Sequence, residues 1–170
     1  TEKIHTAEIW NILDTVSDPE VPVLSVVDLG IIRNVQLIEP PDGGKAGVVI
    51  TITPTYTGCP AMDVISMNIR MAMIENGFAK IEIKTVLSPA WTTDWMSESG
   101  KQKLKAYGIA PPRPVQSVCT PVNFQEEEAI QCPHCNSFHT RLISRFGSTA
   151  CKALYQCGEC KEPFDYFKCH

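Results

Sequence analysis

The chain has 170 residues, of which 44% are hydrophobic and 20% charged, and its formal net charge is −4. This composition permits a packed core and excludes a chain that is disordered throughout. The acidic balance argues against nucleic-acid and anionic-membrane binding, which both need a basic face. No apolar run approaches the roughly 20 residues that span a bilayer, and residues 1–5 lack the apolar stretch of a secretory signal, so we expect a cytoplasmic protein.

The first elements read as a helix followed by a β-hairpin. Thr6 is a candidate N-cap, and one helical face carries Ile9, Trp10, Leu13 and Val16. Two prolines in residues 17–22 end this helix, because proline cannot continue it. Residues 31–38 and 47–53 are rich in Val, Ile and Thr and flank the turn-forming residues 40–44, which predicts two paired strands.

A helix, a strand and a last helix follow. Residues 61–76 have helical periodicity and end at Gly77, with one apolar side formed by Met62, Ile65, Ile69 and Met73, which we expect in the core. Residues 80–87 alternate as a strand, and Ser97 is a candidate N-cap for a helix that ends at Gly108. The order predicts an α+β fold: a small α/β sandwich in which helices cover one face of a three-stranded sheet.

The composition changes at Ala110, where a proline-rich and then acidic stretch begins. We therefore predict three parts: an α/β domain over residues 1–109, a linker over 110–130 and a C-terminal β module over 131–170. A module of about 40 residues can scarcely bury enough core without a covalent or metal staple, and its cysteines are the candidates for one.

Seven of the eight cysteines fall in the last 52 residues. A disulfide framework is one reading of such a number. Four of them, however, form two Cys-x-x-Cys pairs, namely Cys132, Cys135, Cys157 and Cys160. Two residues between thiolates let one tight turn offer both sulfurs to a tetrahedral ion. The pattern predicts a zinc ribbon with a structural zinc ion, while a single iron or an iron–sulfur cluster remains the alternative occupant.

The neighbouring histidines and the other thiols are less informative. We expect His134 and His139 to lie beside the metal centre or in solvent without ligating it. Cys119, Cys151 and Cys169 are left over as ordinary thiols, or Cys151 and Cys169 lie near the metal or form a second labile site.

The remaining cysteine lies in the first domain. Cys59 precedes Pro60 at the predicted start of a helix, where the helix dipole and free amides favour a thiolate. Asp18 and Glu20 lie in another tight loop, so a transient metal site of one thiolate and two carboxylates is one interpretation; a capped turn and a small buried side chain is the other. No histidine lies near Cys59, so a Cys–His hydrolase is poorly supported.

Several segments also carry a family resemblance. In the first domain these are 18–22, 28–31, 55–60 and 89–97, and in the C-terminal part 147–155 and 162–169. The first group resembles the small domain shared by iron–sulfur cluster assembly proteins. With the second group, nearly the whole chain resembles the PaaD family, whose members are associated with the phenylacetyl-CoA epoxidase of aerobic phenylacetate breakdown.

The resemblance implies an accessory protein without catalytic activity of its own. Its partners would be the oxygenase and reductase subunits of the epoxidase, in which it would help to assemble iron or iron–sulfur centres while handling iron or a cluster transiently. The family's pocket falls here on Asp18, Glu20, Val21, Thr55 and Cys59, with Tyr56 where many relatives have a second threonine. A stoichiometric structural subunit is the alternative, and a thiol-dependent transferase is a third. The sequence leaves open the client and whether the chain forms a homodimer.

Overall fold

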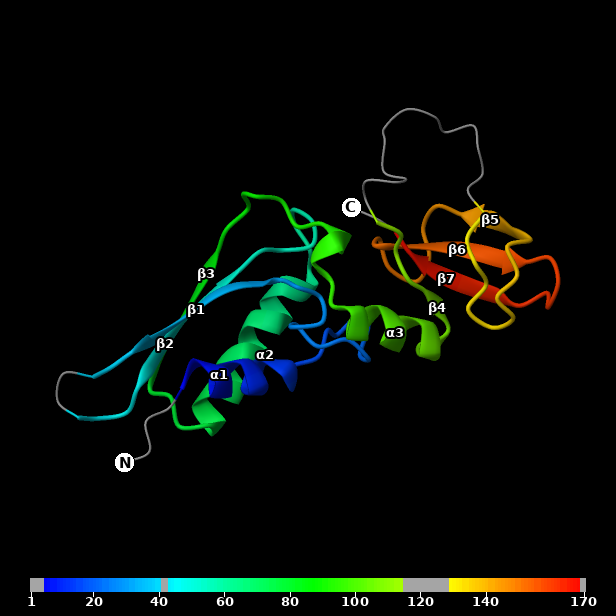
Figure 1. Ribbon diagram of the computed structural model, residues 1–170. Coiled ribbons are helices and arrows are strands. Elements are labelled where there is room, and N and C mark those ends of the chain that lie inside the picture. The colour runs from blue at the N-terminus through cyan, green and yellow to red at the C-terminus, as the bar shows by residue number, and fades with distance from the viewer. Residues whose placement is uncertain (1–4, 41–42, 115–128, 169–170) are drawn as a thin grey trace. The chain divides into compact units, whose positions relative to one another are not determined.

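The computed structural model describes residues 5–40, 43–114 and 129–168. The chain divides into two compact units, the first over residues 1–91 and 95–97 and the second over 92–94 and 98–170 (Figure 1). The predicted division at residues 109, 110–130 and 131 stays a prediction. In the part of the chain that is described, no helix is long and apolar enough to cross a membrane.

The first unit is a three-stranded sheet with helices. Its elements are α1 (Thr6–Asp14), β1 (Ile32–Ile38), β2 (Gly47–Ile52), α2 (Ala61–Glu75) and β3 (Lys80–Thr85). The strand order is β1-β2-β3, with β2 antiparallel to β1 and parallel to β3. A parallel pair needs a crossover connection, and α2 supplies it. The predicted α+β fold class is confirmed.

The helices bury one face of this sheet. Alternate residues of β2 point to that face, and Val48, Ile50 and Ile52 are fully buried. The opposing helical side chains are also buried: Ile9 and Leu13 from α1, and Ala61, Ile65, Ile69 and Met73 from α2. On the other face, Val49 pairs with Gln36 and Glu82, which are less buried than the core strand positions. Strand β3 thus follows the period-2 alternation of a half-covered sheet, whereas the central strand β2 is buried at nearly every position, Val49 included.

Two predicted details differ from the structure. Helix α1 is capped by His5 and not by Thr6, because the Glu8 carboxylate accepts a hydrogen bond from the His5 N–H at 3.2 Å and closes the first turn one residue earlier. Strand β3 ends at Thr85 and not at residue 87, although Val86 still donates its N–H to the Ile52 carbonyl.

The second unit contains α3 (Glu98–Tyr107) and a four-stranded sheet. The strands are β4 (Ile109–Ala110), β5 (Thr140–Ser144), β6 (Lys152–Cys157) and β7 (Pro163–Phe167), in the order β4-β7-β6-β5. Tyr155 stacks on Phe164 at 6.0 Å and meets Tyr166 edge-on at 5.8 Å between ring centroids. Ala110, where the composition changes, belongs to β4 and pairs with Tyr166 of β7.

Gly30 marks a close approach between two loops of the first unit. Its φ of +70° is a left-handed conformation, and a Cβ atom there would lie 2.1 Å from the Trp95 carbonyl oxygen. The neighbouring backbone is also fixed, since the Trp91 indole N–H donates to the Leu29 carbonyl at 2.8 Å. Only glycine satisfies both the backbone angle and the space at this position.

We expect Gly30→Ala to lower the free energy of unfolding by more than the ~1–2 kcal/mol that a left-handed alanine costs by itself, because the Trp95 backbone must also move. Gly77→Ala is the matched control: its φ is +92°, but no atom lies within 4 Å of the added Cβ. Urea unfolding followed by circular dichroism compares the two variants. Equal losses would show that the contact with Trp95 contributes nothing.

Candidate functional site

The four cysteines of the two Cys-x-x-Cys pairs come together in the second unit. Their sulfur atoms all lie within 4.8 Å of one another, with 3.8 Å between Cys132 and Cys160 and 3.5 Å between Cys135 and Cys157. These distances are too long for disulfide bonds of about 2.05 Å. They match the edges of about 3.8 Å in a tetrahedron of sulfurs around a zinc ion with Zn–S bonds of about 2.3 Å. The donor set therefore fits one four-coordinate metal ion.

The thiols of this four-cysteine group do not ionise alike. Burial raises the pKa of the Cys157 thiol, but hydrogen bonds from the backbone N–H groups of Cys160 and Glu159 and from the neighbouring thiols outweigh it and lower the pKa to about 6. At Cys160 the Glu162 N–H lowers the pKa, yet burial and the other three sulfurs raise it to about 12. A cation among the sulfurs offsets this mutual repulsion, so metal binding releases protons.

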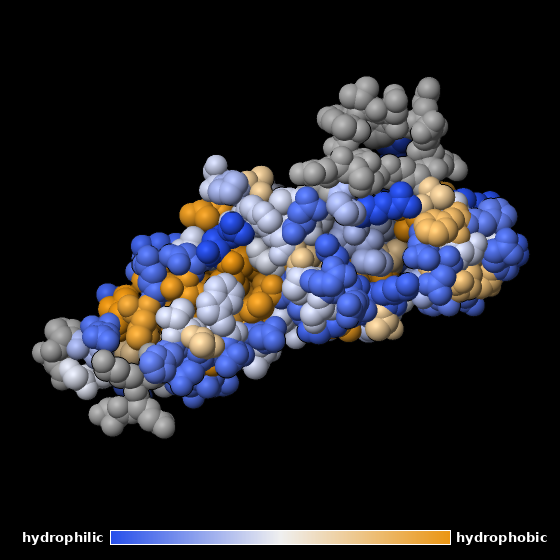
Figure 2. Space-filling view, in the orientation of Figure 1, coloured by the Kyte–Doolittle hydropathy of each residue, from blue (hydrophilic) through white to orange (hydrophobic). Residues whose placement is uncertain are grey.

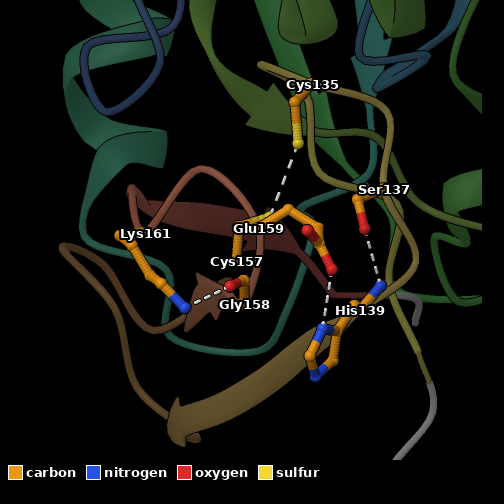
Figure 3. A network of polar contacts seen from close by, with 7 residues as sticks. All are labelled: Cys135, Ser137, His139, Cys157, Gly158, Glu159 and Lys161. Carbon is orange, nitrogen blue, oxygen red and sulfur yellow. Dashed lines mark hydrogen bonds and ion pairs between the residues drawn. The ribbon is translucent and has the colours of Figure 1, made fainter.

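Polar contacts around the sulfurs stabilise the turn of the second Cys-x-x-Cys pair, residues 157–160 (Figure 3). The Gly158 N–H donates to the His139 carbonyl at 2.6 Å, and the His139 ring contacts the Glu159 carboxylate at 3.0 Å. The Lys161 ammonium donates to the Gly158 carbonyl. His139 thus braces the turn from its exposed position, and His134 is also exposed. Within the described residues, the group that could hold a metal consists of the four cysteines without a histidine.

The other C-terminal thiols are only partly described. Cys151 is buried, and its sulfur lies 3.0 Å from the Thr149 hydroxyl. Burial lowers the pKa of the nearby Lys168 ammonium, and the Cys151 thiolate charge offsets part of that effect. Cys119 and Cys169 lie outside the described residues, so a second site formed by Cys151 and Cys169 stays a prediction.

Cys59 lies at the N-terminus of α2, as the sequence predicts. Helical backbone angles begin at Pro60, with φ −67° and ψ −22°, and the Met62 N–H donates to the Cys59 carbonyl at 3.2 Å. Proline suits this position because its missing N–H would have no partner in the helix. The Cys59 side chain is half-buried, as are those of Thr55 and Tyr56. The thiol therefore combines partial access with the positive end of a 15-residue helix.

The loop with Asp18 is a tight turn held by its own carboxylate. Asp18 is 8% exposed, and its Oδ1 accepts hydrogen bonds from the N–H groups of Glu20 at 2.6 Å and Val21 at 3.2 Å. Val21 is buried and Glu20 is half-buried. Asp18 thus fixes the turn, and Glu20 is the more accessible carboxylate of the pair.

Both loops leave the sheet at the same end. Ile52, the last residue of β2, pairs with Ile32 at the start of β1, and the Thr53 N–H donates to the Ile31 carbonyl at 2.9 Å. Residues 17–31 therefore enter β1 at the end where residues 53–60 leave β2. The assembly of Cys59 with Asp18 and Glu20 into one pocket stays a prediction.

Sequence reasoning missed two features of this end of the sheet. The Asp28 carboxylate, 4% exposed, accepts a hydrogen bond from the Ser97 hydroxyl at 2.7 Å and so joins two distant loops. The hydroxyl of Thr53 is buried without a hydrogen-bond partner among the described residues, which is unusual for a buried polar group. The sequence does not indicate that a threonine at the end of a strand will have an unpaired hydroxyl. An Asp near several loop-forming residues is a weak signal for a hydrogen bond between loops.

Comparison with known proteins defines the class of both parts. Residues 6–83 match a family described as iron–sulfur cluster assembly protein, and residues 116–168 match the PaaD zinc beta ribbon domain. A crystal structure of a domain of unknown function, DUF59, from Bacillus anthracis has a TM-score of 0.50 and 29% identity and covers 58% of this chain and 89% of that one. The chain is thus an iron–sulfur assembly domain joined to a zinc ribbon.

Relatives with curated descriptions narrow this class. A Porphyromonas gingivalis protein described as an Fe-S protein maturation auxiliary factor is 38% identical over 105 residues, which are 61% of this chain and 94% of that protein. An Escherichia coli (strain K12) protein, provisionally named as the D component of 1,2-phenylacetyl-CoA epoxidase, is 49% identical over 162 residues, 95% of this chain and 92% of that protein. The chain belongs to the PaaD family, as the resemblance of its motifs indicated.

Replacing one sulfur of the four-cysteine group tests the metal site. We expect Cys132→Ala to lose the single metal ion per chain and the β-structure of the second unit, because a closed site with three sulfurs holds a structural ion poorly. Cys151→Ala, a buried thiol outside the group, is the matched control and should keep the ion. Metal analysis with circular dichroism reads both variants, and full metal content in Cys132→Ala would contradict the assignment.

Proposed function

We propose that this chain is an accessory maturation factor of a phenylacetyl-CoA epoxidase system, located in the cytoplasm. It assists the assembly of iron–sulfur or iron centres in the reductase or oxygenase subunits and does not catalyse the epoxidation. Two sets of relatives support this: maturation factors that match about 60% of the chain, and a relative named as a component of the epoxidase that matches 95% of it.

The single observation that carries the proposal is the position of Cys59. A half-buried thiol just before the first turn of α2 is partly accessible and lies at the positive end of a 15-residue helix. A thiolate is a ligand for iron and for iron–sulfur clusters. Since one thiolate does not complete a coordination sphere, Cys59 suits a transient complex better than a permanent centre.

The other proposed residues of the pocket would complete or position such a complex. Glu20 offers the more accessible carboxylate, whereas Asp18 holds the turn that presents it. The Thr55 hydroxyl stands close to the thiol in sequence and would donate to a sulfur or sulfide, and Val21 is buried within the turn. The carbonyl of Tyr56 accepts a hydrogen bond from the Cys59 N–H at 3.2 Å.

We assign zinc to the four-cysteine group and a structural role to that ion. Four thiolates fill a tetrahedral site and leave no position for water or substrate. Cys132 and Cys157 also belong to the buried core of the second unit, so an ion bound to their sulfurs would stabilise that core directly. In this proposal the second unit docks the client protein, while the first handles iron.

The second candidate function is a stoichiometric structural component of the oxygenase that transfers no metal. The match along nearly the whole length of a relative named as part of the epoxidase favours it. The two functions differ in what they require of Cys59, since a purely structural component has no use for an accessible thiol at that position.

Co-production with the epoxidase subunits distinguishes the two functions. We expect Cys59→Ser to lower the iron and sulfide content of the purified reductase toward the level reached without the chain, because the hydroxyl is a much poorer iron ligand than the thiolate. Iron and sulfide are measured per reductase together with its visible absorption.

Cys151→Ser is the control, because it replaces a thiol outside the proposed pocket. Circular dichroism checks that each variant is folded. Full cluster content with Cys59→Ser would refute metal handling by this thiol. If the variant also co-purified with the oxygenase in a fixed ratio, the structural role would take its place.

A further inference from the structure

Helix α2 has a second apolar side that the first unit does not cover. Its inner side is buried in the core of that unit. Its outer side carries large apolar residues that are 45–61% exposed, namely Val64, Met67, Met71 and Ile74. Apolar residues gather among polar ones on the visible face of this unit (Figure 2). A helix that is apolar on two sides is normally covered on both, so this outer stripe indicates an interaction surface.

The spacing of the outer stripe is that of a helix-pairing seam. The four residues follow one another at intervals of 3, 4 and 3, which corresponds to the a and d positions of a heptad with Val64 and Met71 at a. They form one line of about 15 Å along the helix axis, at 1.5 Å per residue. A seam of this kind receives another helix, with its side chains packed into the gaps between those of the first.

We propose that the outer stripe pairs with the same stripe of a second copy of this chain, with the two α2 helices parallel. A two-fold pair brings each residue opposite itself, so Val64, Met67, Met71 and Ile74 would form successive apolar layers. The two methionines adapt their shape to a partner because they have flexible, unbranched side chains.

Charges beside the stripe select the parallel arrangement. With Val64 at position a, Arg70 falls at g and Glu75 at e, and both side chains are exposed. In a parallel pair a g residue lies next to the e residue five positions further on the other helix. Arg70 of each copy would then meet Glu75 of the other. An antiparallel pair brings g next to g, which would oppose two Arg70 side chains.

The position of Arg70 is already fixed on its own chain. Its Nη1 donates to the Ile81 carbonyl of β3 at 2.7 Å. A guanidinium has five N–H donors, so this bond orients the group and leaves donors for a carboxylate of the second copy.

A seam of three helical turns buries little surface. Interfaces at the small end of the range are weak and transient, so the dimer should form reversibly and depend on protein concentration. A parallel pair would also place both Cys59 loops at one end of the dimer. The functional meaning of that placement rests on the function proposed for Cys59, whereas the pairing itself does not.

Sedimentation velocity of the full chain over a range of concentrations tests the pairing. We expect the wild type to associate reversibly, and we expect Met71→Glu to stay monomeric because it buries a carboxylate in the seam. Leu87→Glu is the matched control, since Leu87 is an apolar residue outside α2 whose exposed fraction, 59%, is close to the 52% of Met71. A monomeric wild type at every concentration, or a dimer that Met71→Glu leaves intact, would overturn the proposal.

Charge exchange and cross-linking test the direction of the helices. Glu75→Arg should weaken the dimer, and Arg70→Glu combined with Glu75→Arg should restore it. Met71→Cys should form a covalent dimer under mild oxidation, more than the wild type or Leu87→Cys does. Cross-linking that occurs only when Met67→Cys and Met71→Cys chains are mixed would show an antiparallel pair and overturn the parallel one.

Discussion

The first unit depends on strand β2, which is hydrogen-bonded on both edges. Its pairing with β1 is antiparallel and its pairing with β3 is parallel. The first pairing brings residues 17–31 and 53–60 to one end of the sheet, and the second requires a crossover helix, which is α2. The loops that contain Asp18 and Cys59 therefore join the sheet at the same end because of strand order, although neither residue belongs to a strand.

The second unit rests on a different constraint, the convergence of four sulfurs. Its buried cluster is small, and two of its eight members are themselves cysteines of the metal-binding group. Burial alone stabilises such a module poorly, so the proposed zinc ion supplies what the core lacks. This difference separates the roles that we propose: a closed, fully ligated site for structure, and a single accessible thiol for transient chemistry.

The sequence predicted the features that rest on period and spacing. A high content of Val, Ile and Thr on both sides of a turn identified the first two strands, and alternation identified the third. The two Cys-x-x-Cys pairs identified the sulfur group, because two residues between thiols restrict the turn that holds them. Sequence-based prediction failed for features that depend on contacts between residues beyond the local pattern. The His5 cap depends on where Glu8 reaches, β4 exists because β7 lies beside it, and nothing in the chain marks the Thr53 hydroxyl as unpaired. Periodicity likewise cannot say whether the outer apolar positions of α2 are covered.

The central claim is that the two thiol sites have separate tasks. Counting zinc, iron and sulfide per chain in protein purified without oxygen, for the wild type and for Cys59→Ser, tests it most directly. We predict one zinc ion per chain in both proteins, with any iron and sulfide confined to the wild type. Iron in place of zinc, retained in full by Cys59→Ser, would place the iron chemistry in the four-cysteine group and contradict the account.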